Sequence, residues 1–194
     1  MPQIILASSS IYRKELLQRL LLDFQIVKPD IEEVRMETES AYETADRLSE
    51  EKTKEVSSQY KEAIVIGCDQ TAEYNNIQIQ KPLNHKTALL QLKELSGKRV
   101  NFHSGVCVHY NKQNIFQKKV ISFDVKYKDL KVAEIESYLK KEKPYNCIGS
   151  IKSEGLGITL LDEINSSDPT AIIGLPLITL VKMLKKVGIN INGG

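Results

Sequence analysis

The chain has 194 residues, which is enough for one sizeable core or two small lobes. Hydrophobic residues make up 41% and charged residues 27%, as in an ordinary soluble globular protein. The formal net charge is +2, so no global field favours nucleic acid or a membrane surface as a partner. Three cysteines, Cys68, Cys107 and Cys147, lie far apart without metal-binding spacing. With no signal-peptide pattern and no membrane-spanning run, these features lead us to expect a cytoplasmic protein with reduced thiols.

Hydrophobic periodicity and turn residues predict alternating strands and helices. The predicted elements are, in order, a strand at 4–7, a helix with apolar positions from 11 to 21, a strand at 24–27, a helix with an apolar stripe from 41 to 56, a strand at 63–68, a hairpin tip at 74–77, a helix at 84–95, strands at 100–110 and 115–127, a helix at 132–141, a loop at 149–157, strands at 158–164 and 171–173, and a helix at 176–187. The central hairpin pair interrupts the alternation, which favours a mixed sheet. Because no repeat or linker is visible, we expect an α/β fold in a single domain, residues 1–194.

Asp69 directly follows the apolar run 63–68, whose length and composition are typical of a strand that is buried on both faces. Ligands of α/β proteins bind beyond the carboxyl ends of such strands, so a carboxylate at this position is a candidate catalytic group. The alternative is an acid that only caps a turn.

Lys52 is the one charged residue on the apolar stripe of the second predicted helix, which begins with a capping box at Ser40 and Glu43. Its ammonium group must either reach past the apolar surface to solvent or meet an anion. Both interpretations are open from the sequence.

Further polar groups at the predicted ends of elements favour a phosphate site. Ser8 opens a run of three serines before a helix, where hydroxyls and free backbone N–H groups can bind an anion, although most such segments only cap the helix. Arg13, one turn later, can form paired hydrogen bonds to phosphate. Lys81 follows the hairpin and is either a further phosphate ligand or a solvated lysine. The glycine spacing of a P-loop is missing.

Glu32 and Glu33 form an acidic pair after a turn, and acids in such loops are most often only solvated. Magnesium sites, however, use one or two carboxylates together with substrate phosphates. Glu32 and Glu33, together with Asp69, are therefore candidate ligands for a divalent cation, Mg²⁺ or Mn²⁺. The histidines lack metal-binding spacing, and no GxSxG motif or cysteine partner supports nucleophilic catalysis.

Several short blocks resemble, in order, those of the Maf-type nucleoside triphosphate pyrophosphatases. They are Leu6–Leu17, Ile66–Gln70, Lys81-Pro82, Leu95–Lys98 and Gly174–Leu177, and they extend over essentially the whole chain. The resemblance implies an elongated mixed β-sheet flanked by helices, with two lobes around a cleft, as in Maf and inosine triphosphate pyrophosphatase-like proteins. It also implies metal-dependent hydrolysis between the α and β phosphates of a nucleotide, which releases pyrophosphate.

The resemblance also implies a role for each candidate residue. Asp69 would activate water and, with Glu33, hold the metal, whereas phosphate would be bound by Ser8, Arg13, Lys52 and Lys81. The partner is then a small nucleotide and neither nucleic acid nor a membrane, and a homodimer is left open.

The likeness is greatest to the subgroup that hydrolyses 7-methyl-GTP. That subgroup has an aromatic residue in the first block, Asp-Gln after the strand and a glutamate in a glycine-containing run, which correspond here to Tyr12, Gln70 and Glu154. A methylated guanine is cationic, so the face of Tyr12 would attract it, while Glu154 could accept from its N1 and N2 donors. Gln70 offers one donor and one acceptor to a base edge.

Two residues depart from this pattern. Ile11 stands where the family usually has proline, and Tyr12 stands where the subgroup usually has tryptophan. A tyrosine ring is smaller than that of tryptophan and stacks less well on a base. The alternatives are a pyrophosphatase for dTTP, UTP or another modified nucleotide, or a nucleotide-binding regulator of septum formation.

Overall fold

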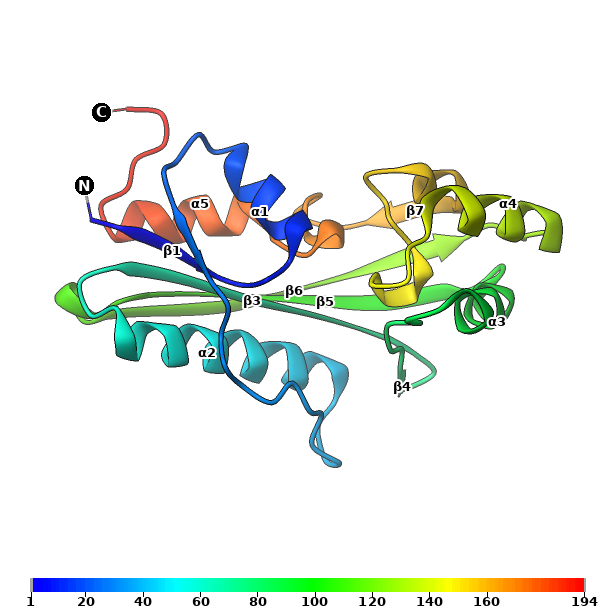
Figure 1. Ribbon diagram of the computed structural model, residues 1–194, viewed down its shortest axis with the longest axis horizontal. Coiled ribbons are helices and arrows are strands. Elements are labelled where there is room, and N and C mark those ends of the chain that lie inside the picture. Colours follow the sequence, from blue (N-terminus) through cyan, green and yellow to red (C-terminus); the bar gives the residue numbers. More distant parts are fainter. Residues whose placement is uncertain (1, 194) are drawn as a thin grey trace. The chain divides into compact units, whose positions relative to one another are not determined.

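The computed structural model describes residues 2–193 and contains a mixed sheet flanked by helices (Figure 1). The strands are β1 Ile4–Ala7, β2 Gln25–Val27, β3 Ile64–Tyr74, β4 Ile77–Gln78, β5 Arg99–Tyr110, β6 Ile115–Tyr127 and β7 Leu161–Asn165. The helices are α1 Ile11–Gln18, α2 Ala41–Gln59, α3 His85–Leu95, α4 Val132–Glu142 and α5 Leu177–Lys186. The strand order is β2-β1-β3-β5-β6-β7, and β4 pairs with β3. Since β1 is parallel to β2 and β3 whereas β4 and β7 pair antiparallel, the predicted mixed α/β sheet is confirmed.

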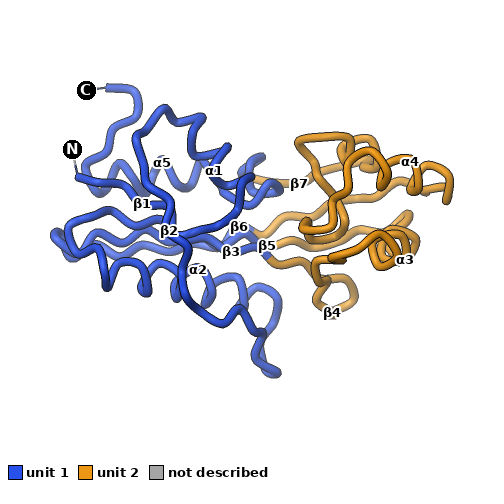
Figure 2. Tube along the Cα trace, viewed as in Figure 1, with its two compact units in different colours: residues 1–70, 103–121, 168–194 blue, residues 71–102, 122–167 orange. Residues whose placement is uncertain are grey.

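The chain divides into two compact units (Figure 2). Unit 1 comprises residues 1–70, 103–121 and 168–194, and unit 2 comprises residues 71–102 and 122–167. The strands β3, β5 and β6 contribute residues to both units. Each unit is therefore assembled from segments that are distant in the sequence.

Unit 1 buries its strands on both faces, with α1 and α5 on one side and α2 on the other (Figure 1). Alternate residues of β3 enter different clusters: Ile64 and Ile66 pack with α1 and α5, whereas Val65 packs with Val56 of α2. Two apolar faces explain why residues 63–68 form a continuous apolar run and do not alternate with polar residues.

Unit 2 packs α3 and α4 against each other and contains the start of β5 and the end of β6. The rings of Phe102 and Phe123 stack with centroids 5.4 Å apart. The fully buried Tyr127 hydroxyl donates to the Gly149 carbonyl at 3.0 Å, which holds the loop before β7 in place. The hairpin tip predicted at 74–77 is present between β3 and β4, with Asn75 and Asn76 at positive φ.

Two predicted boundaries and one predicted element are wrong. The first helix ends at Gln18, and Leu21 is 93% exposed at φ 54°. Residues 171–173 form a 3₁₀ turn, because their backbone N–H groups bond to carbonyls three residues back and not to a neighbouring strand. The strand predicted at 158–164 begins only at Leu161, after another 3₁₀ turn at 156–160. Apolar composition alone could not distinguish these turns from buried strands.

Candidate active site

Asp69 lies within β3 and not at its end, since the strand continues to Tyr74. Its neighbour β1, however, stops at Ala7, which pairs with Gly67. Asp69 therefore lies two positions beyond the end of a parallel neighbour, where the sheet opens at the carboxyl end of β1. Its side chain is only 8% exposed.

The sequence left open whether the Lys52 ammonium group reaches solvent or meets an anion. In the structure it meets two carboxylates. Nζ donates to Asp69 Oδ1 at 2.6 Å and lies 2.9 Å from Glu33 Oε2. The lysine side chain is 3% exposed, whereas that of Glu33 is 52% exposed. A buried ammonium without a partner would cost several kcal/mol, so the pairing with Asp69 is what allows Lys52 to stay on the apolar stripe.

Close packing of α2 on the sheet brings Lys52 to Asp69. A Cβ atom on Gly67 would lie 2.1 Å from Thr53 Oγ1 and 2.7 Å from the Ser49 carbonyl oxygen. On β5, a Cβ on Gly105 would lie 2.3 Å from the Ala45 carbonyl oxygen. Only glycine permits this approach at either position, so these two residues set the distance between helix and carboxylate.

Ser8 and Arg13 lie together at the start of α1. Ser8 is 4% exposed, and its Oγ accepts from Ser10 N at 3.1 Å and from Arg13 Nη1 at 3.4 Å. Arg13 Nε donates to the Gly174 carbonyl at 3.0 Å. Ser10, not Ser8, caps the helix through the backbone N–H of Arg13. The Ser8 hydroxyl is therefore available for a role other than capping.

The side chain of Gln70 is hydrogen-bonded to the turn at 171–173. Its Nε2 group donates to the carbonyls of Ala171 and Ile172, at 2.9 and 3.1 Å, and to Ser104 Oγ at 3.2 Å. Ser104 Oγ in turn donates to the Ala171 carbonyl at 2.7 Å. These bonds tie β3 and β5 to the segment whose Gly174 carbonyl orients Arg13. Sequence reasoning missed Ser104, since a serine inside a strand carries no local signal of such a role.

Tyr12, Lys81 and Glu154 are the remaining candidate residues. Tyr12 is half-buried in the first turn of α1. Lys81 and Glu154 belong to unit 2 and are exposed. The Lys81 loop is held by a hydrogen bond from Leu83 N to the Tyr145 carbonyl at 2.8 Å. The Glu154 loop is held because Glu142 pairs with Lys152 at 2.9 Å and accepts from Leu156 N at 2.6 Å.

The carboxylates of Glu33 and Asp69 both reach one cation, so they are aimed at a common point. In residues 2–193 no group of three or more His, Cys, Asp and Glu side chains could hold a metal ion. Two carboxylates fit Mg²⁺ or Mn²⁺ if substrate phosphates and water complete the shell, which is how magnesium is usually bound. Burial raises the pKa of the Cys68 thiol and that of Cys107, the latter to about 12, so neither is a reactive thiolate.

The family model described as Maf-like protein matches residues 3–187. This chain belongs to the Maf family. It is similar to 7-methyl-GTP pyrophosphatases of Methylobacillus flagellatus, with 46% identity over 98% of this chain and 100% of the relative, and of Nitrosospira multiformis, with 45% identity over 97% and 96%. The relative of the same name from Paraburkholderia xenovorans is 46% identical over 96% of this chain and 93% of its own.

A search of solved structures finds the Ham1 protein of Staphylococcus aureus, with a TM-score of 0.42 and 15% identity over 66% of this chain and 72% of that one. This likeness is too slight to support any functional argument. Of the helices in residues 2–193, none combines the length and apolar character that a bilayer span requires.

Proposed function

We propose that this Maf-family protein is a nucleoside triphosphate pyrophosphatase that hydrolyses 7-methyl-GTP to 7-methyl-GMP and pyrophosphate. The observation that carries the proposal is the buried Lys52 ammonium shared by Asp69 and Glu33, in a chain whose full-length relatives bear that enzyme name. A cation and two carboxylates at one point can accept a proton from water and neutralise phosphate charge.

Asp69 is the proposed general base. Lys52 bonds its Oδ1, and no described residue donates to Oδ2, which leaves that oxygen to accept a proton from water. Hydrolysis adds one water across the α–β anhydride, and the proton that Asp69 removes returns to a product or to solvent. Lys52 has three N–H donors, of which the two carboxylates use two, so one remains for a phosphate oxygen.

Arg13, Ser8 and Lys81 are the proposed phosphate ligands. The Gly174 carbonyl accepts from Arg13 Nε, and Nη1 donates to the Ser8 hydroxyl. The terminal guanidinium nitrogens would therefore donate to a phosphate oxygen. Glu33 and Asp69 would hold Mg²⁺ or Mn²⁺, which when bound supplies charge neutralisation and a more acidic water.

The proposed base selection combines Tyr12, Glu154 and Gln70. Tyr12 would stack on the cationic ring, and Glu154 would accept from guanine N1 and N2. Because the amino group of Gln70 is used by Ala171 and Ile172, only Oε1 is left for a base edge. Gln70 would therefore act as an acceptor.

The test is pyrophosphate release from 7-methyl-GTP, GTP, UTP and dTTP with Mg²⁺ or Mn²⁺. We expect 7-methyl-GTP to be the best substrate. A preference for UTP or dTTP would replace the substrate but keep the reaction, whereas binding without pyrophosphate release would favour a nucleotide-binding regulator of septum formation. A cytoplasmic location and a homodimer remain proposals, and sedimentation of the purified protein tests the second.

A further inference from the structure

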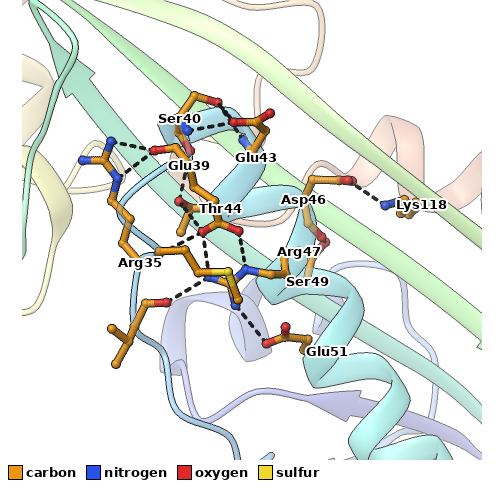
Figure 3. Close-up of polar contacts among 12 residues, drawn as sticks. Arg35, Glu39, Ser40, Glu43, Thr44, Asp46, Arg47, Ser49, Glu51 and Lys118 are labelled. Carbon is orange, nitrogen blue, oxygen red and sulfur yellow. Dashed lines mark hydrogen bonds and ion pairs between the residues drawn. The ribbon is translucent and has the colours of Figure 1, made fainter.

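The segment between Glu33 and α2 has no regular secondary structure but is bonded to the helix at several points (Figure 3). Arg47, in the second turn of α2, is the centre of these bonds. Its Nη2 donates to the Val34 carbonyl at 2.9 Å and to Glu39 Oε2 at 2.8 Å, and its Nε donates to Glu39 Oε1. Its Nη1 donates to Glu51 Oε2 at 3.0 Å. One guanidinium therefore bonds both ends of the segment to α2.

Glu39 is itself held in place, so the contact is a network and not an isolated surface pair. Its Oε2 also accepts from Met36 N and Thr44 Oγ1, both at 3.2 Å. Arg35 donates through Nε and Nη2 to the Glu39 carbonyl, at 2.9 and 2.6 Å. The Arg47 and Glu39 side chains are only 20% and 12% exposed. A partly buried network of this kind is worth more than a solvent-exposed pair.

We infer that Arg47 is a positioning residue that holds the Glu33 carboxylate at Lys52 and Asp69. The carbonyl of Val34 belongs to the residue directly after Glu33, so the bond from Arg47 restrains the backbone next to this carboxylate. Glu33 is half exposed, and a free loop would lose conformational entropy each time it placed the carboxylate at the site. The inference rests on the proposed function, since it assigns Glu33 a role in the same site.

The geometry requires arginine. A guanidinium is a rigid fork that can bond the Val34 carbonyl, both oxygens of Glu39 and Glu51 at once. A lysine has one nitrogen and cannot reach these acceptors together. Arg47→Lys is therefore a charge-conserving test of the network, and Arg47→Gln is the more complete deletion.

Lys118, which lies on β6, provides a matched control because it binds carboxylates of the same helix. Its Nζ lies 2.6 Å from Asp46 Oδ2 (Figure 3). It also lies 2.8 Å from Glu50 Oε2, so it joins two carboxylates of α2. Among the described residues, its hydrogen bond and ion pairs go to Asp46 and Glu50 and not to residues 33–39. Lys118→Gln thus removes a comparable ion-pair pattern while leaving the Glu33 segment bonded to the helix.

The experiment measures Mn²⁺ binding by electron paramagnetic resonance in the full chain, with and without pyrophosphate. We expect Arg47→Gln to weaken Mn²⁺ binding about 10- to 100-fold, as for other groups that orient a metal ligand, and Arg47→Lys to weaken it less. Lys118→Gln should stay within about 2-fold, the usual scale of an exposed pair. In a Glu33→Gln background, Arg47→Gln should cause no further loss, because the carboxylate it positions is gone.

Direct binding separates this inference from the proposed function, because it needs no turnover. A protein that binds Mn²⁺ in the expected pattern but releases no pyrophosphate would overturn the function and keep the positioning role. Equal Mn²⁺ affinity in wild type and Arg47→Gln, no Mn²⁺ binding by either, or a full additional loss in the Glu33→Gln background would each overturn the inference. A shift in the denaturation midpoint alone would mean that Arg47 only stabilises the fold.

Discussion

The charged candidate residues of unit 1 and unit 2 are held in different ways. Lys52 and Asp69 are almost fully buried and paired, on elements that pack through glycine contacts. Lys81 and Glu154 are exposed on loops that other residues hold by backbone and side-chain bonds. Buried charges serve stability and chemistry together, whereas exposed charges can be removed with little structural cost. We therefore expect removal of a buried charge in unit 1 to lower both stability and activity. Removal of an exposed charge in unit 2 should lower activity alone.

The largest effect is expected from Asp69→Asn, which keeps the shape of the side chain but removes the base. Turnover should fall about 10²- to 10⁴-fold, the usual contribution of general base catalysis. The measurement is kcat for pyrophosphate release, accompanied by a circular dichroism spectrum. Near-normal turnover in a folded Asp69→Asn protein would remove Asp69 from the mechanism.

Next in size is the contrast between Lys52→Ala and Lys81→Ala. Both should lower kcat/KM, since each removes a cation from the proposed phosphate site. Only Lys52→Ala should also destabilise the fold, by roughly 3 kcal/mol, because it leaves the buried Asp69 carboxylate without its partner.

Urea denaturation midpoints measured beside kcat/KM test this contrast. Equal stability losses in the two lysine variants would contradict the difference between buried and exposed charges. Unchanged kinetics in both would place the phosphate site elsewhere.

A smaller effect is expected for base selection. Tyr12→Ala and Glu154→Gln should each reduce the preference for 7-methyl-GTP over GTP, since both act on the positive charge of the methylated ring. A cation–π contact of about 0.5–2 kcal/mol corresponds to roughly 2- to 30-fold. Tyr12→Trp should keep or increase the preference. Competition between the two nucleotides measures the ratio, and an unchanged ratio in Tyr12→Ala would exclude stacking as its source.

The smallest effect concerns acid stability. Hydrogen bonds from Arg47 lower the pKa of Glu39 from 4.5 to about 2. A carboxyl group with a lowered pKa contributes stability that is present above about pH 4.5 and is lost as the pH falls toward 2. Glu39→Gln should therefore flatten the decline of the denaturation midpoint over that interval. The same decline in wild type and variant would mean that other carboxylates dominate.

Local patterns in the sequence were sufficient for the parts of the fold that depend on near neighbours. The capping box at Ser40 and Glu43 is present in α2, and the turn at Asn75 and Asn76 joins β3 to β4. Both depend on residues within one turn of each other, so composition and spacing determine them. The resemblance to the Maf family could likewise be found in the sequence, because the residues within each matching block are consecutive.

Lys52 marks the limit of that reasoning. Its place on an apolar stripe required either solvent or an anion, and only the packing of α2 on β3 shows that Asp69 and Glu33 are its partners. The opening in the sheet at Asp69 is likewise a tertiary feature. It arises because the parallel neighbour β1 stops at Ala7, whereas β3 itself continues beyond Asp69.

The sequence by itself therefore determined the alternating elements, the family and the chemical types of the candidate site residues. The tertiary structure decided which groups meet: Gln70 with the carbonyls of Ala171 and Ile172, and Arg47 with Val34 and Glu39. The reason is physical. Propensities and caps act within a few residues of the chain, whereas a buried donor takes the acceptor that packing places beside it, whatever their separation in sequence.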